Sequence, residues 1–408
     1  MSADDRDESR ARRAKSIDER LARRAAKSAE RLVRRATSGD ASLAGRAKSN
    51  AGLLAGVAGL TAVGTVAGVS AARSLGRHSV IEDPYTGENF ELLDADRGYV
   101  VTTADGVPLA VREVGPVDAP LTVVFAHGFC LCMGAFHFQR ARLEREWGSL
   151  VRMVFYDQRG HGQSGEAPTE TYTVPQLGRD LETLLQVMVP RGSVVLVGHS
   201  MGGMTILSHA RQYPQRYGDR IVAAALISSA AEGLPRSPLG EILQNPGLEA
   251  VRFAARYAPK LVHRGRGAAR SALSPILRAA SYGDEKISPT LVAFSERMIH
   301  DTPVATLVEF LHALEVHDES AALPVLAKVP TLIACGANDV LTPVVNSEEI
   351  AAALPNSELL IVAGAGHLVQ LEQPDAINDA MVRLVERATP SKLFAPMKRP
   401  HDRTPPRD

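Results

Sequence analysis

The stretch SVVLVGHSMGG, residues 193–203, joins an apolar run directly to a serine that stands between glycines. Its first residues predict a buried strand, and the following MTILSHARQYP, residues 204–214, predicts a helix. Residues 198–202 have the pattern G-x-S-x-G, with Ser200 at the centre. So sharp a turn forces the serine into strained backbone angles, and bulky residues at positions 198 and 202 would collide with it. We therefore expect the Ser200 hydroxyl at the carboxyl end of a sheet, where a helix N-terminus favours negative charge.

A serine hydroxyl is a weak nucleophile until a base takes its proton, and that base needs an orienting acid. The chain offers both after two later apolar runs: Asp339 follows PTLIACG, and His367 follows SELLIVAGAG. The carboxyl ends of parallel strands meet at one edge of a sheet, so these side chains can converge on Ser200. We predict that Ser200 attacks, that His367 acts as base and then acid, and that Asp339 orients the histidine.

Short apolar runs alternate with helical segments along most of the chain, which predicts an α/β fold with a mostly parallel, doubly wound sheet. Residues 98–115 predict a hairpin that precedes these runs. The interval 230–323 breaks the rhythm, because it is helical and punctuated by proline and glycine, and we interpret it as a helical cap inserted into the fold. The predicted core therefore has two parts, 98–229 and 324–387, and the proline-rich tail 388–408 is expected to be disordered.

The order Ser, Asp, His and the GHSMGG turn resemble the α/β-hydrolase family, in its capped, lipase- and esterase-like branch. The resemblance covers residues 98–387. It implies an oxyanion hole made by the backbone N–H groups of Met201 and of Phe129, the latter in a His-Gly-Phe turn after LTVVFA. Two such amides supply a few kcal/mol each to the transition state.

The implied activity is hydrolysis of a carboxylic ester through an acyl-enzyme, with a small lipophilic ester or acyl substrate and with neither a metal nor an organic cofactor. A serine at this turn argues against epoxide hydrolases and haloalkane dehalogenases, which place an aspartate there. Thioesterase, amidase, carbon–carbon bond hydrolase and haloperoxidase-like perhydrolase activities use the same triad and stay open. Outside the enzymes, a ligand-binding module on the same fold is the alternative.

Other polar residues have structural interpretations. In the resembling family the segment DQRGHGQSG, with Asp157 and His161, braces loops rather than doing chemistry. His199 is expected to be packed, and Cys130 and Cys132 to be small buried hydrophobic residues. The twelve histidines show no metal-binding spacing. Basic and acidic residues both number 46, so the net charge of zero gives no reason to expect nucleic acid as a partner.

The N-terminal region differs from the rest of the chain. Residues 1–50 repeat Glu, Arg, Arg and Ala at a period of 11, which places each set on one face of a helical arm. Residues 51–72 carry no charge, and a helix of this length measures about 33 Å, enough to cross a bilayer. Because arginines are concentrated before the segment, we predict a single-pass membrane protein with a cytoplasmic arm and the hydrolase domain outside. A cytoplasmic hydrolase with a packed helical arm is the alternative.

Overall fold

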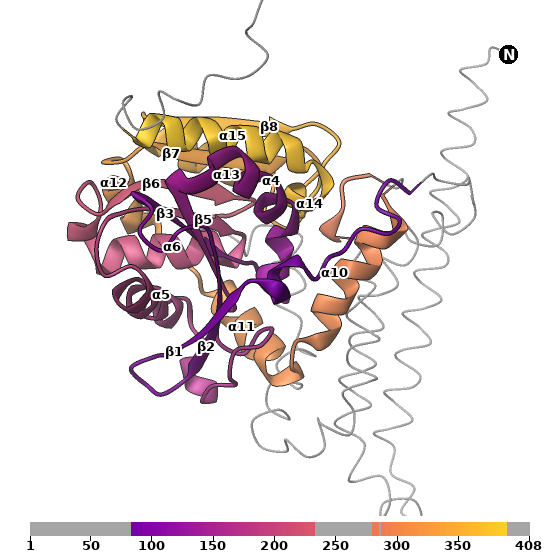
Figure 1. The fold of residues 1–408 in the computed structure, drawn as a ribbon, viewed down its shortest axis with the longest axis horizontal. Coiled ribbons are helices and arrows are strands. Elements are labelled where there is room, and N and C mark those ends of the chain that lie inside the picture. Colours follow the sequence, from indigo (N-terminus) through magenta and orange to yellow (C-terminus); the bar gives the residue numbers. More distant parts are fainter. Residues whose placement is uncertain (1–82, 233–279, 285–286, 390–408) are drawn as a thin grey trace, which may run out of the picture. The chain divides into compact units, whose positions relative to one another are not determined.

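The computed structural model describes residues 83–232, 280–284 and 287–389. Its centre is an eight-stranded sheet in the order β1-β2-β4-β3-β5-β6-β7-β8 (Figure 1). The first two strands form an antiparallel hairpin, β2 also pairs antiparallel with β4, and every other pairing is parallel. The strands are β1 Arg97–Thr102, β2 Pro108–Val114, β3 Leu121–Ala126, β4 Val151–Tyr156, β5 Ser193–His199, β6 Ile221–Ile227, β7 Thr331–Gly336 and β8 Ser357–Val362. The predicted mostly parallel α/β fold is therefore confirmed.

The central strands are mostly apolar because helices cover both faces of the sheet. In β3, β4 and β7 every residue is buried, as a parallel sheet with two covered faces requires. Phe125 of β3 pairs with Phe155 of β4, and their rings stack with centroids 4.4 Å apart. A stacked pair of this kind adds about 0.5–1.5 kcal/mol beyond the buried area.

Two helical layers enclose the sheet (Figure 1). Helices α5 and α6 pack with α12 and α13 on one face, whereas α4 and α15 pack together on the other. The N-terminus of α5 shows why such helices begin where they do: the Thr173 hydroxyl accepts the N–H of Gln176 and Pro175 occupies the first turn. The helices are α4 His137–Trp147, α5 Val174–Met188, α6 Met201–Gln212, α10 Pro289–Asp301, α11 Val304–Glu315, α12 Leu323–Leu326, α13 Val344–Ala353, α14 Val369–Glu372 and α15 Pro374–Ala388. Short 3₁₀ helices are η1 Leu92–Ala95, η2 Met133–Phe136, η3 Gly148–Leu150, η4 Thr169–Thr171, η5 Pro214–Arg216 and η7 Ser320–Ala322.

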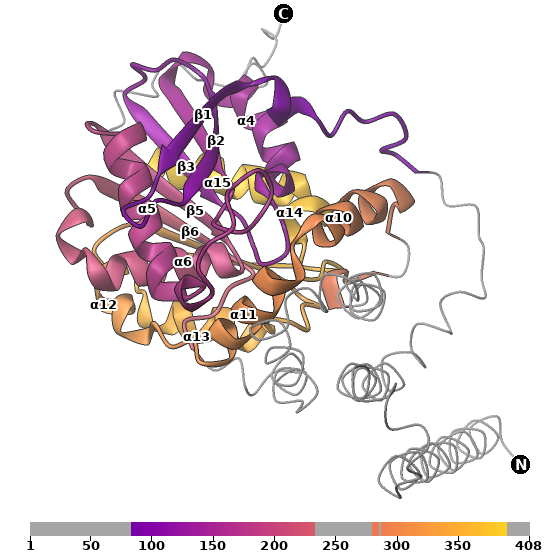
Figure 2. The same ribbon diagram turned by 90° about the horizontal axis from the view of Figure 1, so that it is seen from below.

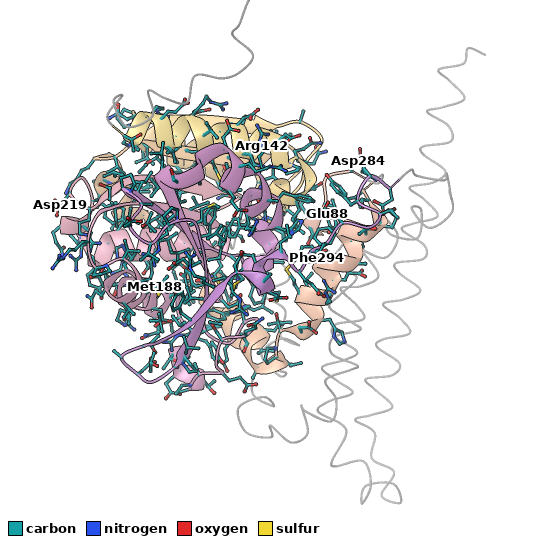
Figure 3. The ribbon with its side chains drawn as sticks, in the orientation of Figure 1. Glu88, Arg142, Met188, Asp219, Asp284 and Phe294 are labelled. Carbon is teal, nitrogen blue, oxygen red and sulfur yellow. The ribbon has the colours of Figure 1, made fainter. Side chains whose placement is uncertain are left out.

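The described part of the predicted cap consists mainly of α10 and α11, which follow one another along one side of the core (Figure 2). A segment that precedes β1 holds α10. Asp83 accepts hydrogen bonds from the Ser288 hydroxyl at 2.6 Å and from the N–H of Thr290 at 3.0 Å, both at the start of α10. Further along, Phe90 stacks on Phe294 with ring centroids 4.2 Å apart. Figure 3 labels Phe294 on α10 and Glu88, which belongs to the same segment before β1 as Phe90.

Some sequence predictions fall outside the described residues: the arm 1–50, the candidate membrane helix 51–72, most of the tail and residues 233–279 of the cap. In the part of the chain that the structure does describe, no helix combines the length and the hydropathy needed to cross a bilayer. The predicted membrane span therefore stays a prediction.

Candidate active site

Ser200 occupies a strained turn between β5 and α6. Its backbone angles, a φ of 52° and a ψ of −117°, lie in a region that residues other than glycine rarely adopt. Strain of this kind costs about 1–3 kcal/mol of folding free energy. The flanking glycines are sterically necessary, since a Cβ on Gly198 would lie 2.4 Å from the carbonyl carbon of Gly202. Hydrogen bonds hold the turn: the Ser200 N–H donates to the Ile227 carbonyl at 2.8 Å, and the Ser229 hydroxyl donates to the Ser200 carbonyl at 2.9 Å.

Asp339 and His367 form a buried pair. The Nδ1 atom of His367 lies 2.9 Å from Oδ2 of Asp339 and 3.1 Å from Oδ1. Because Nδ1 faces a carboxylate, the neutral imidazole carries its proton there and leaves Nε2 free to accept one. The pair thus has the tautomer that a general base needs.

The loop after β7 prepares the Asp339 carboxylate. The N–H groups of Leu341 and Thr342 donate to Oδ1, each at 2.9 Å, and the Thr342 hydroxyl donates to Oδ2 at 2.9 Å. Burial by itself raises the pKa of Asp339, but the charge and hydrogen bond of His367 and the Thr342 donors outweigh it, so the pKa lies below its usual value. Asp339 is therefore ionised at neutral pH.

One pocket brings the predicted nucleophile and base together. Ser200 and His367 both line it, and Phe129 lines it as well. Asp339 lies behind His367 and is buried, and Met201 is the first residue of α6, directly after Ser200. The structure thus places all five predicted site residues in or directly beside one site.

The turn that carries Phe129 approaches the serine closely. A Cβ on Gly128 would lie 3.2 Å from Cβ of Ser200 and 2.6 Å from Nδ1 of His199, so glycine is required at this position. The N–H of Cys130, whose φ is 58°, donates to Nε2 of His161 at 3.2 Å. Burial lowers the pKa of His161 to about 4, so its ring is neutral and can accept this bond.

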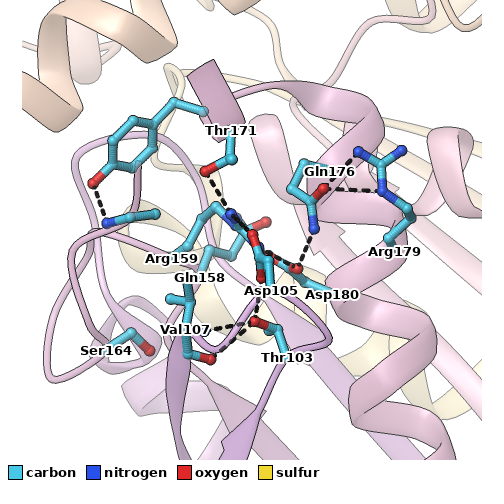
Figure 4. A network of polar contacts seen from close by, with 12 residues as sticks. Thr103, Asp105, Val107, Gln158, Arg159, Ser164, Thr171, Gln176, Arg179 and Asp180 are labelled. Carbon is cyan, nitrogen blue, oxygen red and sulfur yellow. Dashed lines mark hydrogen bonds and ion pairs between the residues drawn. The ribbon is translucent and has the colours of Figure 1, made fainter. Parts of the chain in front are cut away.

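The DQRGHGQSG segment makes hydrogen bonds that brace neighbouring loops, in agreement with its interpretation from the sequence. Asp157 accepts the N–H groups of Met133 and Gln163, each at 2.7 Å, and burial raises its pKa to about 6. In this segment Arg159 is fully buried and bonds both oxygens of Asp180, at 2.6 Å and 2.7 Å. Figure 4 shows Arg159 with Asp180.

Arg159 also joins the β1–β2 hairpin to the helical layer. It donates to Asp105 at 2.9 Å and to the Thr171 hydroxyl at 2.7 Å (Figure 4). The hydrogen bonds from the guanidinium hold the pKa of Asp105 at about 2. This network fixes the scaffold around the pocket and contributes no residue to its lining.

Some residues of the site were not found by sequence reasoning. Thr342 supports Asp339, and its position three residues later in NDVLT is the signal that could have found it. His199 was predicted to be packed, and it is fully buried, but its Nε2 also bonds the backbone carbonyl of His367 at 2.9 Å. Glu372 contacts the histidine loop through a backbone N–H of Gly366 at 2.8 Å, for which the sequence gives no local pattern.

Comparison with known proteins agrees with this geometry. The family model described as the alpha/beta hydrolase fold matches residues 122–374, more than half of the chain, so the protein belongs to the α/β-hydrolase family. It is a hydrolase by this membership. In the ranges that the structure describes, no group of three or more His, Cys, Asp or Glu side chains is arranged to hold a metal ion.

Individual relatives are distant. The 3-oxoadipate enol-lactonase 2 of Acinetobacter baylyi is 26% identical over 290 residues, covering 70% of this chain and 96% of that protein. A putative carbamate hydrolase of Escherichia coli is 26% identical over 242 residues, covering 59% of this chain and 82% of that protein. A thermophilic esterase from Thermogutta terrifontis superposes with a TM-score of 0.59 at 25% identity, covering 72% of this chain and 99% of the esterase chain.

Proposed function

We propose that this protein hydrolyses carboxylic esters through an acyl-enzyme formed on Ser200. One observation carries the proposal: the strained Ser200 and His367 line the same pocket, and Nδ1 of His367 lies 2.9 Å from the buried carboxylate of Asp339. These are the nucleophile, the base and the orienting group that acyl transfer needs. The thermophilic esterase among the structural neighbours supports the same reaction class.

In the proposed mechanism, Nε2 of His367 takes the hydroxyl proton while Oγ of Ser200 forms a bond to the ester carbonyl carbon. The N–H groups of Met201 and Phe129 stabilise the oxyanion, and the Asp339 carboxylate stabilises the imidazolium. The imidazolium then gives its proton to the departing alcohol as the C–O bond breaks. A water molecule, deprotonated by the same histidine, releases the acid and restores the serine.

Cys130 also lines the pocket, but it is a poor rival for the nucleophile. Burial raises the pKa of its thiol, so the neutral form dominates at physiological pH and the reactive thiolate is scarce. Ser200, in contrast, shares its pocket with a histidine that can act as base.

The pocket favours a small lipophilic, uncharged acyl group. Its described lining contains no Lys, Arg, Asp or Glu side chain, so a carboxylate on the substrate would find no cation there. The cap contributes directly, with Ile299 from α10 and Leu314 from α11. The apolar side chains of the lining are Phe129, Leu131, Met204, Ile299, Leu314, Leu341 and Leu368.

A second candidate is hydrolysis of a lactone, which is an internal ester. Similarity to the enol-lactonase, which aligns over 96% of its length, favours it. The same three groups would act, and the departing alcohol would stay attached to the acyl product. A neutral lactone fits the uncharged lining better than an acidic one.

Covalent labelling by a fluorophosphonate, followed by turnover of p-nitrophenyl esters and of neutral lactones of increasing chain length, tests the proposal. We expect labelling of wild type and none of Ser200→Ala, whose esterase rate falls by about 10⁶-fold while its unfolding temperature stays near that of wild type. Labelling that survives in Ser200→Ala would overturn the assignment of the nucleophile. Faster turnover of lactones than of matched open-chain esters would select the second candidate.

A further inference from the structure

Glu372 connects two segments that are far apart in the sequence. At the end of α14 its Oε1 accepts the N–H of Gly366 at 2.8 Å, and its Oε2 accepts the N–H of Gly283 at 2.9 Å. Gly366 directly precedes His367, whereas Gly283 belongs to the cap segment 280–284 that leads toward α10. One carboxylate thus holds both the histidine loop and the cap.

The two segments meet backbone to backbone at this point. A Cβ on Gly283 would lie 2.3 Å from the carbonyl carbon of Ala365, and a Cβ on Gly366 would lie 2.4 Å from the nitrogen of Gly283. Such contacts leave no room for a side chain on either glycine. A small movement of the cap segment is therefore transmitted to the residue before His367.

Further hydrogen bonds tie the same segments together. The Asn338 side chain donates to the Gly283 carbonyl at 2.9 Å, and the Asn338 N–H donates to the Ala365 carbonyl at 2.9 Å. The Leu368 N–H donates to the carbonyl of Ser281 at 3.0 Å, and Ser281 lines the pocket. The cap segment, the histidine loop and the loop of the orienting acid thus form one junction beside the pocket.

We propose that Glu372 is a positioning residue of the active site, whose ionised carboxylate sets the place of His367 and of the cap segment beside the pocket. The proposal rests on the proposed serine hydrolase function. An ionised carboxylate accepts a hydrogen bond at each oxygen, which is the observed arrangement. When the group is protonated, the oxygen that carries the proton becomes a donor and a weaker acceptor, so its hydrogen bond to one of the two N–H groups weakens.

The environment of Glu372 makes this change sensitive to pH near neutrality. Burial raises its pKa to about 7, although the two backbone N–H groups and the charge of His367 act in the opposite direction. The charge of Asp339 raises this pKa further, and Asp284 stands next to Gly283 in the cap segment (labelled in Figure 3). Both hydrogen bonds to the carboxylate are thus at full strength above about pH 7, and one is weakened below it.

The stability of the fold depends on the protonation of Glu372 in the opposite direction from the positioning of His367. This difference separates a positioning role from mere structural support. The folded protein holds the Glu372 proton more tightly than the unfolded chain, because the pKa is raised on folding. Stability therefore decreases as the pH rises from the unfolded pKa to about 7. Ionised Glu372 is retained at a cost to stability, so removing its charge should not destabilise the protein at alkaline pH.

The test measures kcat and KM for a p-nitrophenyl ester from about pH 5.5 to about pH 9 in wild type, Glu372→Gln and Glu349→Gln. The last is a matched control, because Glu349 is exposed on α13. We expect a slope above one for log kcat/KM against pH in wild type just below pH 7, since the ionisation of Glu372 adds to the ordinary requirement for an unprotonated general base. Glu372→Gln should show a slope of one and a kcat lowered about 10-fold at the alkaline end, with an unfolding temperature close to that of wild type. Glu349→Gln should match wild type.

A slope of one in wild type, or a Glu372→Gln variant with the wild-type kcat and profile, would overturn the positioning role while leaving the ester hydrolase intact. If Glu372→Gln does not fold, the slope of the wild-type profile decides alone. Absence of both esterase activity and fluorophosphonate labelling in wild type is a different result: it refutes the proposed function, and the positioning role with it.

Discussion

Thr342 shows how a single side chain sets the chemistry of its neighbours. Its hydroxyl and its N–H both donate to Asp339, and the hydroxyl oxygen also lies 3.3 Å from Nδ1 of His367. These contacts favour the ionised carboxylate and fix its two oxygens against the imidazole. The loop that carries Asp339 thus holds its carboxylate ionised and oriented before any substrate binds.

This preparation leads to a prediction for the acid and the base. Asp339→Asn removes the charge that stabilises the imidazolium and favours the wrong tautomer, so we expect kcat to fall by about 10³- to 10⁴-fold. The kcat of His367→Ala should be lower still, close to that of Ser200→Ala. Because the pKa of Asp339 is lowered, this carboxylate stays ionised around neutral pH and does not shape the pH–rate profile there. Steady-state kinetics of the purified variants measure these effects.

Asp157→Asn is the matched control for that prediction. Asp157 is also a buried aspartate beside a glycine-rich loop, but it does not line the pocket. If Asp157→Asn were the crippling change and Asp339→Asn were harmless, the orienting acid would be wrongly assigned. Circular dichroism of both variants distinguishes lost chemistry from lost folding.

At the scale of elements, the cap depends on the segment before β1. Asp83 accepts the Ser288 hydroxyl and two donors of Thr290, so it satisfies N–H and O–H groups at the start of α10. Hydrogen bonds from these two side chains hold the pKa of Asp83 at about 2. Helix α10 in turn places Ile299 on the pocket.

We therefore expect Asp83→Ala to loosen α10 and to raise KM for an apolar ester by several-fold, while kcat changes little. The triad lies on other elements, so the chemical step should survive. Faster proteolytic cleavage within 280–301 is the independent measurement. An unchanged KM together with unchanged proteolysis would show that Asp83 does not hold the cap. Asp118→Ala, which alters another aspartate on the β2–β3 loop, serves as the control.

The elements that sequence reasoning found are those with a local signal. The apolar runs predicted β3 to β8, and the G-x-S-x-G pattern placed Ser200 at the turn from β5 into α6, because an apolar strand and a strained turn both leave a local mark in the sequence. The contact of Glu372 with Gly283 joins residues 89 positions apart, and neither residue has a pattern that points to the other. The hold of Asp83 on α10 spans 205 positions to Ser288 and is equally invisible locally. Long-range polar contacts need the fold before they can be seen.

At the scale of the whole molecule, the catalytic unit is built so that three loops converge. The turn after β5 carries the serine, the loop after β7 carries the aspartate, and the loop after β8 carries the histidine. All three follow the carboxyl ends of parallel strands, which end at the same edge of the sheet. The cap helices α10 and α11 add Ile299 and Leu314 to the pocket at this edge, so substrate selection can change without change to the triad.

The last prediction concerns where this unit resides. Residues 51–72 lack charge over a length sufficient to span a bilayer, and arginines are concentrated on their N-terminal side, so we expect the full-length protein to remain in the membrane pellet after carbonate extraction. A chain lacking residues 1–75 should move to the supernatant and keep its esterase activity, because the described catalytic unit begins after that point. A protease added to intact cells should reach the hydrolase domain if the arm is cytoplasmic. Full-length protein found wholly in the supernatant would remove the membrane hypothesis and favour the helical arm packed on its own surface or on a neighbouring subunit.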